Sequence, residues 1–332
     1  MPEPPASRLR AAIAALPLTI EAAVVHTTEI AIPSYGEERR PTSTVELSGG
    51  GCRGYGEHVG WTADDHRAFG RWAATLPRGT RTLESLHDEL APRRREHAYD
   101  CAALESAALD LALHQQAETL ASLAGVAHAP LRYVRSFAAP PNPVAAVRGW
   151  RNEAPAIGLK LDVEPSWTED TLAALSEIGG ITILDGKLRG TAETAAAWAA
   201  AFPRAVLEDP AAPEAVPARL RPRLALDGPV SGAEPVSTIE TFRPGHVNLK
   251  VPRLGGILPL LDVACTCAAL GIAVYFGGMF EVGVGRMQAR SLASLLCPDG
   301  PNDLAPIPGA ESSGLPERIP AAAASGGFGP AA

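Results

Sequence analysis

The chain has 332 residues, of which 46% are apolar and 20% are charged. These values are ordinary for a globular protein and leave room for about two domains. The 29 basic and 37 acidic residues give a net charge of −8, which argues against a long basic surface. We therefore expect neither a nucleic acid nor a membrane as a partner.

The five cysteines are odd in number and include no Cys-x-x-Cys pair. We expect them to be reduced, buried residues of a cytoplasmic protein. Residues 263–280 carry no charge over 18 positions, but Gly271, Gly277 and Gly278 interrupt this run. A helix, a turn and a buried strand therefore explain it better than a transmembrane helix. The N-terminus carries Glu3 and several prolines, which is unlike a signal peptide.

The first third of the chain has strand patterns followed by helical ones. Residues 20–32 and 43–48 are rich in strand-forming residues, and three glycines at 49–51 predict a hairpin after the second run. Residues 63–125 have helical patterns, clearest over 102–125, where apolar residues recur at helical spacing. This order indicates an antiparallel sheet covered by helices.

The rest of the chain alternates short apolar segments with Ala-rich helical ones, which predicts parallel βαβ units. The seven expected strands cover residues 132–138, 157–163, 181–185, 205–208, 223–227, 246–250 and 272–276. An eighth strand near Asp303 and Leu304 would close a barrel, and an open doubly wound sheet is the alternative. No Gly-x-Gly-x-x-Gly follows the first of these strands, which weakens a dinucleotide site.

Acidic residues end three consecutive strands of this set. Asp185, Glu208 and Asp227 are 23 and 19 residues apart, and each interval matches one βα unit. The C-terminal strand ends of a barrel form its active-site mouth, so these carboxylates should converge there. A divalent cation relieves their repulsion, and all-oxygen ligation favours Mg²⁺ over Zn²⁺. The alternative is that each carboxylate caps the helix after its strand.

Two lysines flank the acids. Lys160 lies in the second strand and Lys250 ends the sixth, so in a barrel of eight strands they face each other across the mouth. Burial and a nearby cation lower the pKa of a lysine toward neutrality, where it can act as a base. A metal that holds a carboxylate stabilises the enolate formed beside it. The pattern therefore predicts proton abstraction next to a carboxylate, and ion pairing of each lysine is the alternative.

The motifs, in order, resemble the enolase superfamily, in the branch of muconate-lactonizing enzymes, o-succinylbenzoate synthases and dipeptide epimerases. The similar segments are Val45–Glu57 with its Gly-x-Gly-Glu end, the Ala-rich helix at Ala103–Gly125, Leu207–Pro210, Asn248–Ile257 and Gly278–Gly285. The superfamily uses a Lys or His base with Mg²⁺ to stabilise an ene-diolate.

This resemblance implies an α/β fold, a modified (β/α)7β TIM-type barrel with an N-terminal α+β capping domain. The cap would comprise residues 1–128, completed by the tail 306–332, and the catalytic barrel residues 129–305. The metal ligands carried over are Asp185, Glu208 and Asp227. The acid/base pair carried over is Lys160 and Lys250.

The sequence departs from the family at two positions. The family has Lys-x-Lys on strand two and Asp-x-Asn on strand three, whereas this chain has Lys160-Leu161-Asp162 and Asp185-Gly186-Lys187. Alternate residues of a strand share a face, so one strand loses an ammonium group where its neighbour gains one. We hypothesise that Lys187 replaces the missing lysine, with Asp162 as its ion-pair partner. The alternatives are an exposed loop lysine or a site without activity.

Other candidate residues rest on weaker patterns. Glu281 either contacts the substrate or caps the next helix, and Tyr35 lies in the loop that closes over the mouth in this family. With Asp162 they form the predicted substrate-binding set. The helix start at Gly283 and Gly285 could hold an anion through its free N–H groups.

We expect a small carboxylate as the substrate and Mg²⁺ as the cofactor, and a homo-oligomer is compatible with the sequence. The incomplete lysine pair favours a lyase of the dehydratase or o-succinylbenzoate synthase kind, because elimination needs one base. The Glu281 segment resembles epimerases and favours racemisation. The rival interpretations are a metal-binding barrel without proton transfer and a phosphate-binding barrel enzyme.

Overall fold

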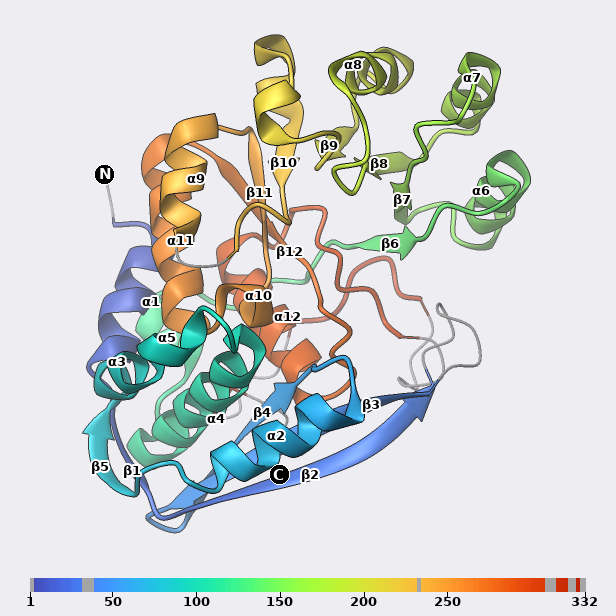
Figure 1. Ribbon diagram of the computed structural model, residues 1–332. Coiled ribbons are helices and arrows are strands. Elements are labelled where there is room, and N and C mark those ends of the chain that lie inside the picture. The colour runs from blue at the N-terminus through green and yellow to red at the C-terminus, as the bar shows by residue number, and fades with distance from the viewer. Residues whose placement is uncertain (1–2, 32–38, 232–233, 308–314, 322–326, 329–332) are drawn as a thin grey trace.

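The computed structural model describes residues 3–31, 39–231, 234–307, 315–321 and 327–328. A cap made from the N-terminal third lies beside a curled parallel sheet whose strands alternate with helices (Figure 1). This is the predicted fold class.

The cap contains a three-stranded antiparallel sheet, β2 (Ala22–Ala31), β3 (Arg39–Gly49) and β4 (Cys52–His58). The predicted hairpin joins β3 to β4, and Gly50 and Gly51 turn it with positive φ angles of 57° and 76°.

The sheet packs closely against α4 (Ala98–Gln116). A Cβ atom on Gly54 would lie 2.1 Å from Leu111 N, and one on Gly56 would lie 2.1 Å from Ala103 O. Glycines on the strand and alanines on the helix therefore allow this contact.

The remaining elements of the cap surround α4. They are α1 (Pro5–Ala14), β1 (Pro17–Ile20), α2 (Ala63–Ala73), β5 (Gly79–Thr82), α3 (Leu83–Arg94) and α5 (Leu120–Ala124). The prediction of helix across 63–125 is wrong at β5, which pairs antiparallel with β1. Thr82 ends that strand and accepts the N–H of Ser85, so the same residue starts α3.

The barrel sheet has seven parallel strands in the order β12-β11-β10-β9-β8-β7-β6. They are β6 (Val134–Phe137), β7 (Gly158–Asp162), β8 (Ile181–Asp185), β9 (Val206–Glu208), β10 (Leu224–Leu226), β11 (His246–Leu249) and β12 (Ala273–Phe276). Each lies within the segment predicted from the apolar runs.

Helices follow the strands and cover the outside of the sheet (Figure 1). They are α6 (Pro143–Glu153), α7 (Glu169–Ile178), α8 (Ala192–Ala201), the 3₁₀ turns Pro213–Ala215 and Ala218–Arg223, α9 (Pro235–Phe242), α10 (Val251–Leu254), α11 (Ile257–Leu270) and α12 (Val284–Leu296).

Two residues join the edges of the sheet. Asn302 forms a parallel bridge with Tyr133 beside β6, and Asp303 forms one with Gly277 beside β12. Val134 N donates to Asn302 O at 2.9 Å, and Asp303 N donates to Phe276 O at 2.7 Å. The expected eighth strand is therefore reduced to single bridges that close the barrel.

The described parts of the tail return to both units. Ile319 pairs with Leu131 at the start of the barrel, and Phe328 N donates to Asp110 of α4. All five cysteines are free, two of them fully buried. Within the described ranges, no helix is both long and apolar enough to cross a membrane.

Candidate active site

Lys160 lies at the centre of the strand-end acids. Its side chain is only 2% exposed, and its Nζ donates to Glu208 Oε1 at 2.6 Å. The same atom lies 3.1 Å from Asp185 Oδ2 and 3.4 Å from Asp303 Oδ2. One ammonium group therefore bridges acids from three strand ends.

Glu208 is held from two further directions. Asn248 Nδ2 donates to its Oε1 at 3.2 Å, and the Tyr275 hydroxyl donates to its Oε2 at 2.5 Å. Burial, with the repulsion of Asp185 and Asp227, raises the pKa of Glu208 to about 8 although Lys160 opposes the shift. Glu208 is therefore fixed in position, and Lys160 does not fully offset the effects of burial and of the neighbouring acids on its pKa.

Asp227 is bound by a different pair of cations. Lys250 Nζ donates to Asp227 Oδ2 at 2.8 Å, and Arg253 lies beside Oδ1. Burial favours the neutral acid, but Lys250 and Arg253 together keep the pKa of Asp227 well below its usual range.

Lys187 reaches the opposite end of this row of acids. Its Nζ lies 2.5 Å from Asp185 Oδ2 and 3.2 Å from Asp162 Oδ1, so the expected pair with Asp162 is present. The side chain is 45% exposed, unlike that of Lys160. Lys187 and Leu188 both have positive φ, at 51° and 61°, a conformation that is strained for residues with side chains.

These three lysines are the only ones in the chain. The other 26 of its 29 basic residues are arginines. Lys160, Lys187 and Lys250 all contact strand-end acids, so the barrel mouth contains every lysine side chain of the protein.

The sequence was compared with models of known protein families. Residues 11–123 and 127–308 match the N-terminal and C-terminal domain models of a family described as domain of unknown function DUF8230. The chain belongs to the DUF8230 family. Two further comparisons, with curated proteins and with solved structures, show which other proteins this DUF8230 protein resembles.

The curated relatives match over part of their length. The DUF8230 chain is 32% identical over 167 residues to an N-succinylamino acid racemase of Amycolatopsis sp., covering 47% of this chain and 45% of that protein. It is 48% identical over 48 residues to an o-succinylbenzoate synthase of Enterococcus faecalis, covering 14% and 13%. The matched part thus spans less than half of each relative.

Solved structures share the fold over most of the chain. A dipeptide epimerase of Methylococcus capsulatus, complexed with Mg, has a TM-score of 0.72 at 22% identity and 86% and 89% coverage. A mandelate racemase/muconate-lactonizing enzyme homologue of Roseovarius nubinhibens, complexed with magnesium, has a TM-score of 0.73 at 22% identity and 94% and 96% coverage. Together with the curated relatives, these structures confirm the resemblance to the enolase superfamily.

The donor set of the DUF8230 site suits a divalent cation in chemistry and charge. The acids around the mouth are Asp162, Asp185, Glu208, Asp209, Asp227 and Asp303, and the cations beside them are Lys160, Lys187, Lys250 and Arg253. The acidic groups outnumber the cationic ones by six to four. All donors are hard oxygens, and the buried Asn248 Oδ1 beside Glu208 has no hydrogen-bond partner. These features fit Mg²⁺.

Lysine side chains bind the three strand-end carboxylates in the structure. Among the residues that the structure describes, no three acidic, histidine or cysteine side chains form a group that could hold a metal. Lys160 stands between Asp185 and Glu208, and Asp227 is bound to Lys250. The assignment of these three acids as metal ligands therefore stays a prediction.

Glu281 lies apart from the row of acids. Its carboxylate accepts the N–H of Met279 at 2.8 Å, and its own carbonyl accepts from Arg286. Burial raises the pKa of Glu281 above its usual value, and Arg286 opposes that shift. Tyr35, the other predicted substrate residue, lies outside the described residues.

The anion site expected at the start of α12 is filled by the protein itself. Glu57 of the cap accepts the N–H groups of Val282, Gly283 and Gly285 at 2.8, 3.0 and 2.9 Å. The N-terminus of this helix binds a carboxylate, as its dipole favours. A substrate phosphate would have to displace Glu57, which disfavours the phosphate-binding interpretation.

Several residues of the site were not predicted, Arg253 beside Asp227 among them. Asn248 lies two positions before Lys250, so strand alternation could have placed it on the same face. Asp303 was expected only as part of a closing strand. Tyr275 and Asp209 had no signal, because their roles depend on which side chains meet inside the closed barrel.

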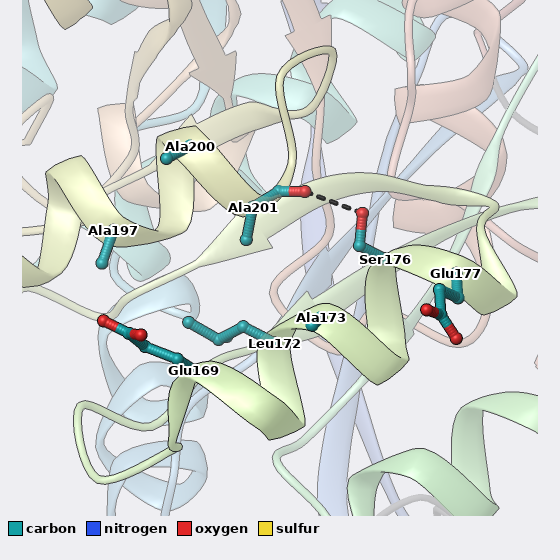
Figure 2. A pocket seen from close by; sticks show the side chains of 8 residues that line it. All are labelled: Glu169, Leu172, Ala173, Ser176, Glu177, Ala197, Ala200 and Ala201. Atoms are coloured by element: carbon teal, nitrogen blue, oxygen red, sulfur yellow. Dashed lines mark hydrogen bonds between the residues drawn. The ribbon is translucent and has the colours of Figure 1, made fainter.

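A groove of about 520 Å³ lies elsewhere, between α7 and α8 on the outside of the barrel. It is lined by four alanines, Leu172, Ser176 and two glutamates, and Ser176 donates to the carbonyl of Ala201 across it (Figure 2). It contains no cationic group and none of the row of acids, so we place the active site at the mouth.

Proposed function

We propose that this protein removes the proton from the carbon α to a substrate carboxylate and returns a proton to that carbon, as a racemase or epimerase. The observation that carries this proposal is the position of two amines. Lys187 contacts acids of β7 and β8, and Lys250 contacts the acid that follows β10; β9, which ends at Glu208, lies between β8 and β10 in the sheet.

Inversion at carbon requires a proton acceptor on one face and a proton donor on the other. In the proposed reaction the C–H electron pair passes into the carboxylate as an enediolate, and the proton moves to one lysine Nζ. The ammonium of the other lysine then protonates the opposite face. Lys187 replaces Lys160 as the proposed partner of Lys250, because the Lys160 side chain is almost fully buried and its Nζ contacts three acids.

The distribution of lysine supports this assignment. An arginine keeps its proton at any ordinary pH, whereas a lysine can lose it. The chain uses arginine at 26 positions and lysine only at the mouth. A requirement for charge alone would not separate the two residue types so completely, so the confinement of lysine supports a part for these side chains in proton transfer at the mouth.

We propose Mg²⁺ as the cofactor, held by Asp185, Glu208 and Asp227. Bound there, it would stabilise the enediolate and favour neutral amines nearby. The proposed substrates are amino acids carrying an N-acyl group or dipeptides. The names of the racemase relative and of the structurally similar epimerase support this class.

The test uses NMR to monitor loss of the α-proton signal in D₂O containing MgCl₂. The substrate panel contains N-succinyl amino acids, N-acetyl amino acids and dipeptides of both configurations. We expect exchange into both enantiomers of at least one substrate, with the stereoisomer appearing at a comparable rate. Metal binding without exchange in any substrate of the panel would favour the non-catalytic interpretation.

A second candidate is elimination of water from a β-hydroxy acid. The matches to o-succinylbenzoate synthases support it, and it needs only one of the two amines. Release of an unsaturated product without inversion of a recovered substrate would favour this reaction over the first.

A further inference from the structure

Lys160 uses the carboxylate oxygens that the proposed metal would need. Its Nζ lies 2.6 Å from Glu208 Oε1 and 3.1 Å from Asp185 Oδ2. A metal ion bound between these two acids would lie close to the Lys160 ammonium group. In a buried site, the two positive charges would repel each other at this distance. A metal and Lys160 would therefore compete for these two oxygens.

The surrounding contacts would keep the acids in place without Lys160. Asn248 and Tyr275 hold Glu208, and Lys187 N donates to Asp185 Oδ1 at 3.1 Å. Lys160 itself has a third acceptor, Asp303 Oδ2 at 3.4 Å. The ammonium group therefore has another partner within reach.

We propose that Lys160 is an exchangeable internal cation. It neutralises Asp185 and Glu208 when no metal is bound, and it gives up these oxygens and retains Asp303 when a divalent ion enters. Metal binding then replaces one cation by another instead of filling a preformed cage. This inference rests on the proposed function only for the presence of a divalent ion.

The decisive measurement is the affinity of the full chain for Mn²⁺, followed by the electron paramagnetic resonance of the free ion. Lys160→Met removes the competing charge, and we expect it to tighten Mn²⁺ binding tenfold or more. Tyr275→Phe is the matched control, because it also removes a donor to Glu208 but leaves the charge unchanged. We expect it to leave the affinity equal or weaker.

Asp303→Asn should act in the opposite direction. It removes the alternative partner of Lys160, so the ammonium group stays on Asp185 and Glu208 and Mn²⁺ binds several-fold more weakly. An unchanged or weaker affinity in Lys160→Met would overturn the proposal, as would the absence of Mn²⁺ binding in all forms of the protein.

The wild-type protein offers a second measurement should Lys160→Met fail to fold. Labelling with [¹⁵N]lysine gives only three side-chain ammonium groups, and Lys160 is the most deeply buried of them. MgCl₂ should shift its signal and speed the exchange of its protons with water. A Lys160 signal that MgCl₂ leaves unchanged contradicts the exchange.

These results are independent of turnover. Tighter binding by Lys160→Met together with no deuterium exchange in any substrate would support the internal cation and contradict the proposed reaction. Exchange activity with a Lys160→Met affinity equal to that of the wild type would do the reverse.

Discussion

Asp162 stands where the enolase superfamily has the second lysine of strand two, and Lys187 stands where it has the asparagine of strand three. The two side chains form an ion pair at 3.2 Å, and Lys187 also contacts Asp185. A cation therefore lies beside Asp162, but it comes from the turn that follows β8. The proposed role of Lys187 can be tested by restoring the family pattern.

We expect Lys187→Asn and Asp162→Lys each to lower kcat by about 100-fold, the scale of one general acid–base group. The double variant, which recreates Lys-x-Lys and Asp-x-Asn, should recover to within about tenfold of the wild type. Steady-state kinetics on the best substrate of the panel would measure this. Additive losses in the double variant would mean that the two positions are not interchangeable.

The two amines should differ in the face that they serve. With Lys187→Met, we expect inversion to stop while the α-proton of one enantiomer still exchanges with D₂O. Lys250→Met should retain exchange of the other enantiomer, because each variant keeps one base. NMR of the separate enantiomers gives the readout. Loss of exchange from both enantiomers in both variants would point instead to a single base.

At the scale of elements, Glu57 joins the cap to the barrel. Its carboxylate accepts three N–H groups at the start of α12, a helix whose own N-cap, Gly283, has no side chain to do so. We expect Glu57→Gln to lower the free energy of unfolding by about 1–3 kcal/mol, because an amide binds N–H groups more weakly than a carboxylate. Urea unfolding measures the change.

Glu46→Gln is the control for that experiment. It makes the same substitution in the same sheet, but Glu46 forms its ion pair with the largely exposed Arg53. An ion pair of this kind contributes about 0–1 kcal/mol. Equal losses from Glu57→Gln and Glu46→Gln would argue against Glu57 as a link between the two units.

Elements were predictable where one pattern determines them. The apolar runs predicted all seven barrel strands, because a strand buried on both faces needs apolar residues throughout. The pair β1 and β5 was missed, since β5 has only four residues and three of them are exposed. The row of acids followed from strand ends, whereas Asp303 and Tyr275 did not, because their contacts with Lys160 and Glu208 depend on how the closed barrel staggers its strands.

At the scale of the molecule, closure of the barrel depends on Asn302. Its side chain accepts the N–H of Phe276 and donates to the carbonyls of Arg132, Cys297 and Gly300. The residue is fully buried and lies between the first and last strands of the sheet. The Asn302 amide thus satisfies backbone groups on both sides of the seam, the junction between β6 and β12.

We expect Asn302→Ala to lower the free energy of unfolding by about 3 kcal/mol or more, since it leaves several buried backbone groups unsatisfied. Asn142→Ala is the control, because Asn142 caps only α6 at the surface and its loss should cost about 1 kcal/mol. Thermal and urea unfolding would compare them. Similar losses from both variants would mean that the seam is held by its backbone alone.

The confinement of lysine to the mouth has a practical consequence for anyone who handles this protein. Acylating dyes, cross-linkers and activated resins react with side-chain amines on the outside of most proteins, but the lysines of this sequence all lie at the entrance of the barrel. Lys187 is the most accessible of the three side chains, so it should react first. Routine coupling chemistry would thereby act as an inhibitor, and a substrate that shields the entrance should protect against it.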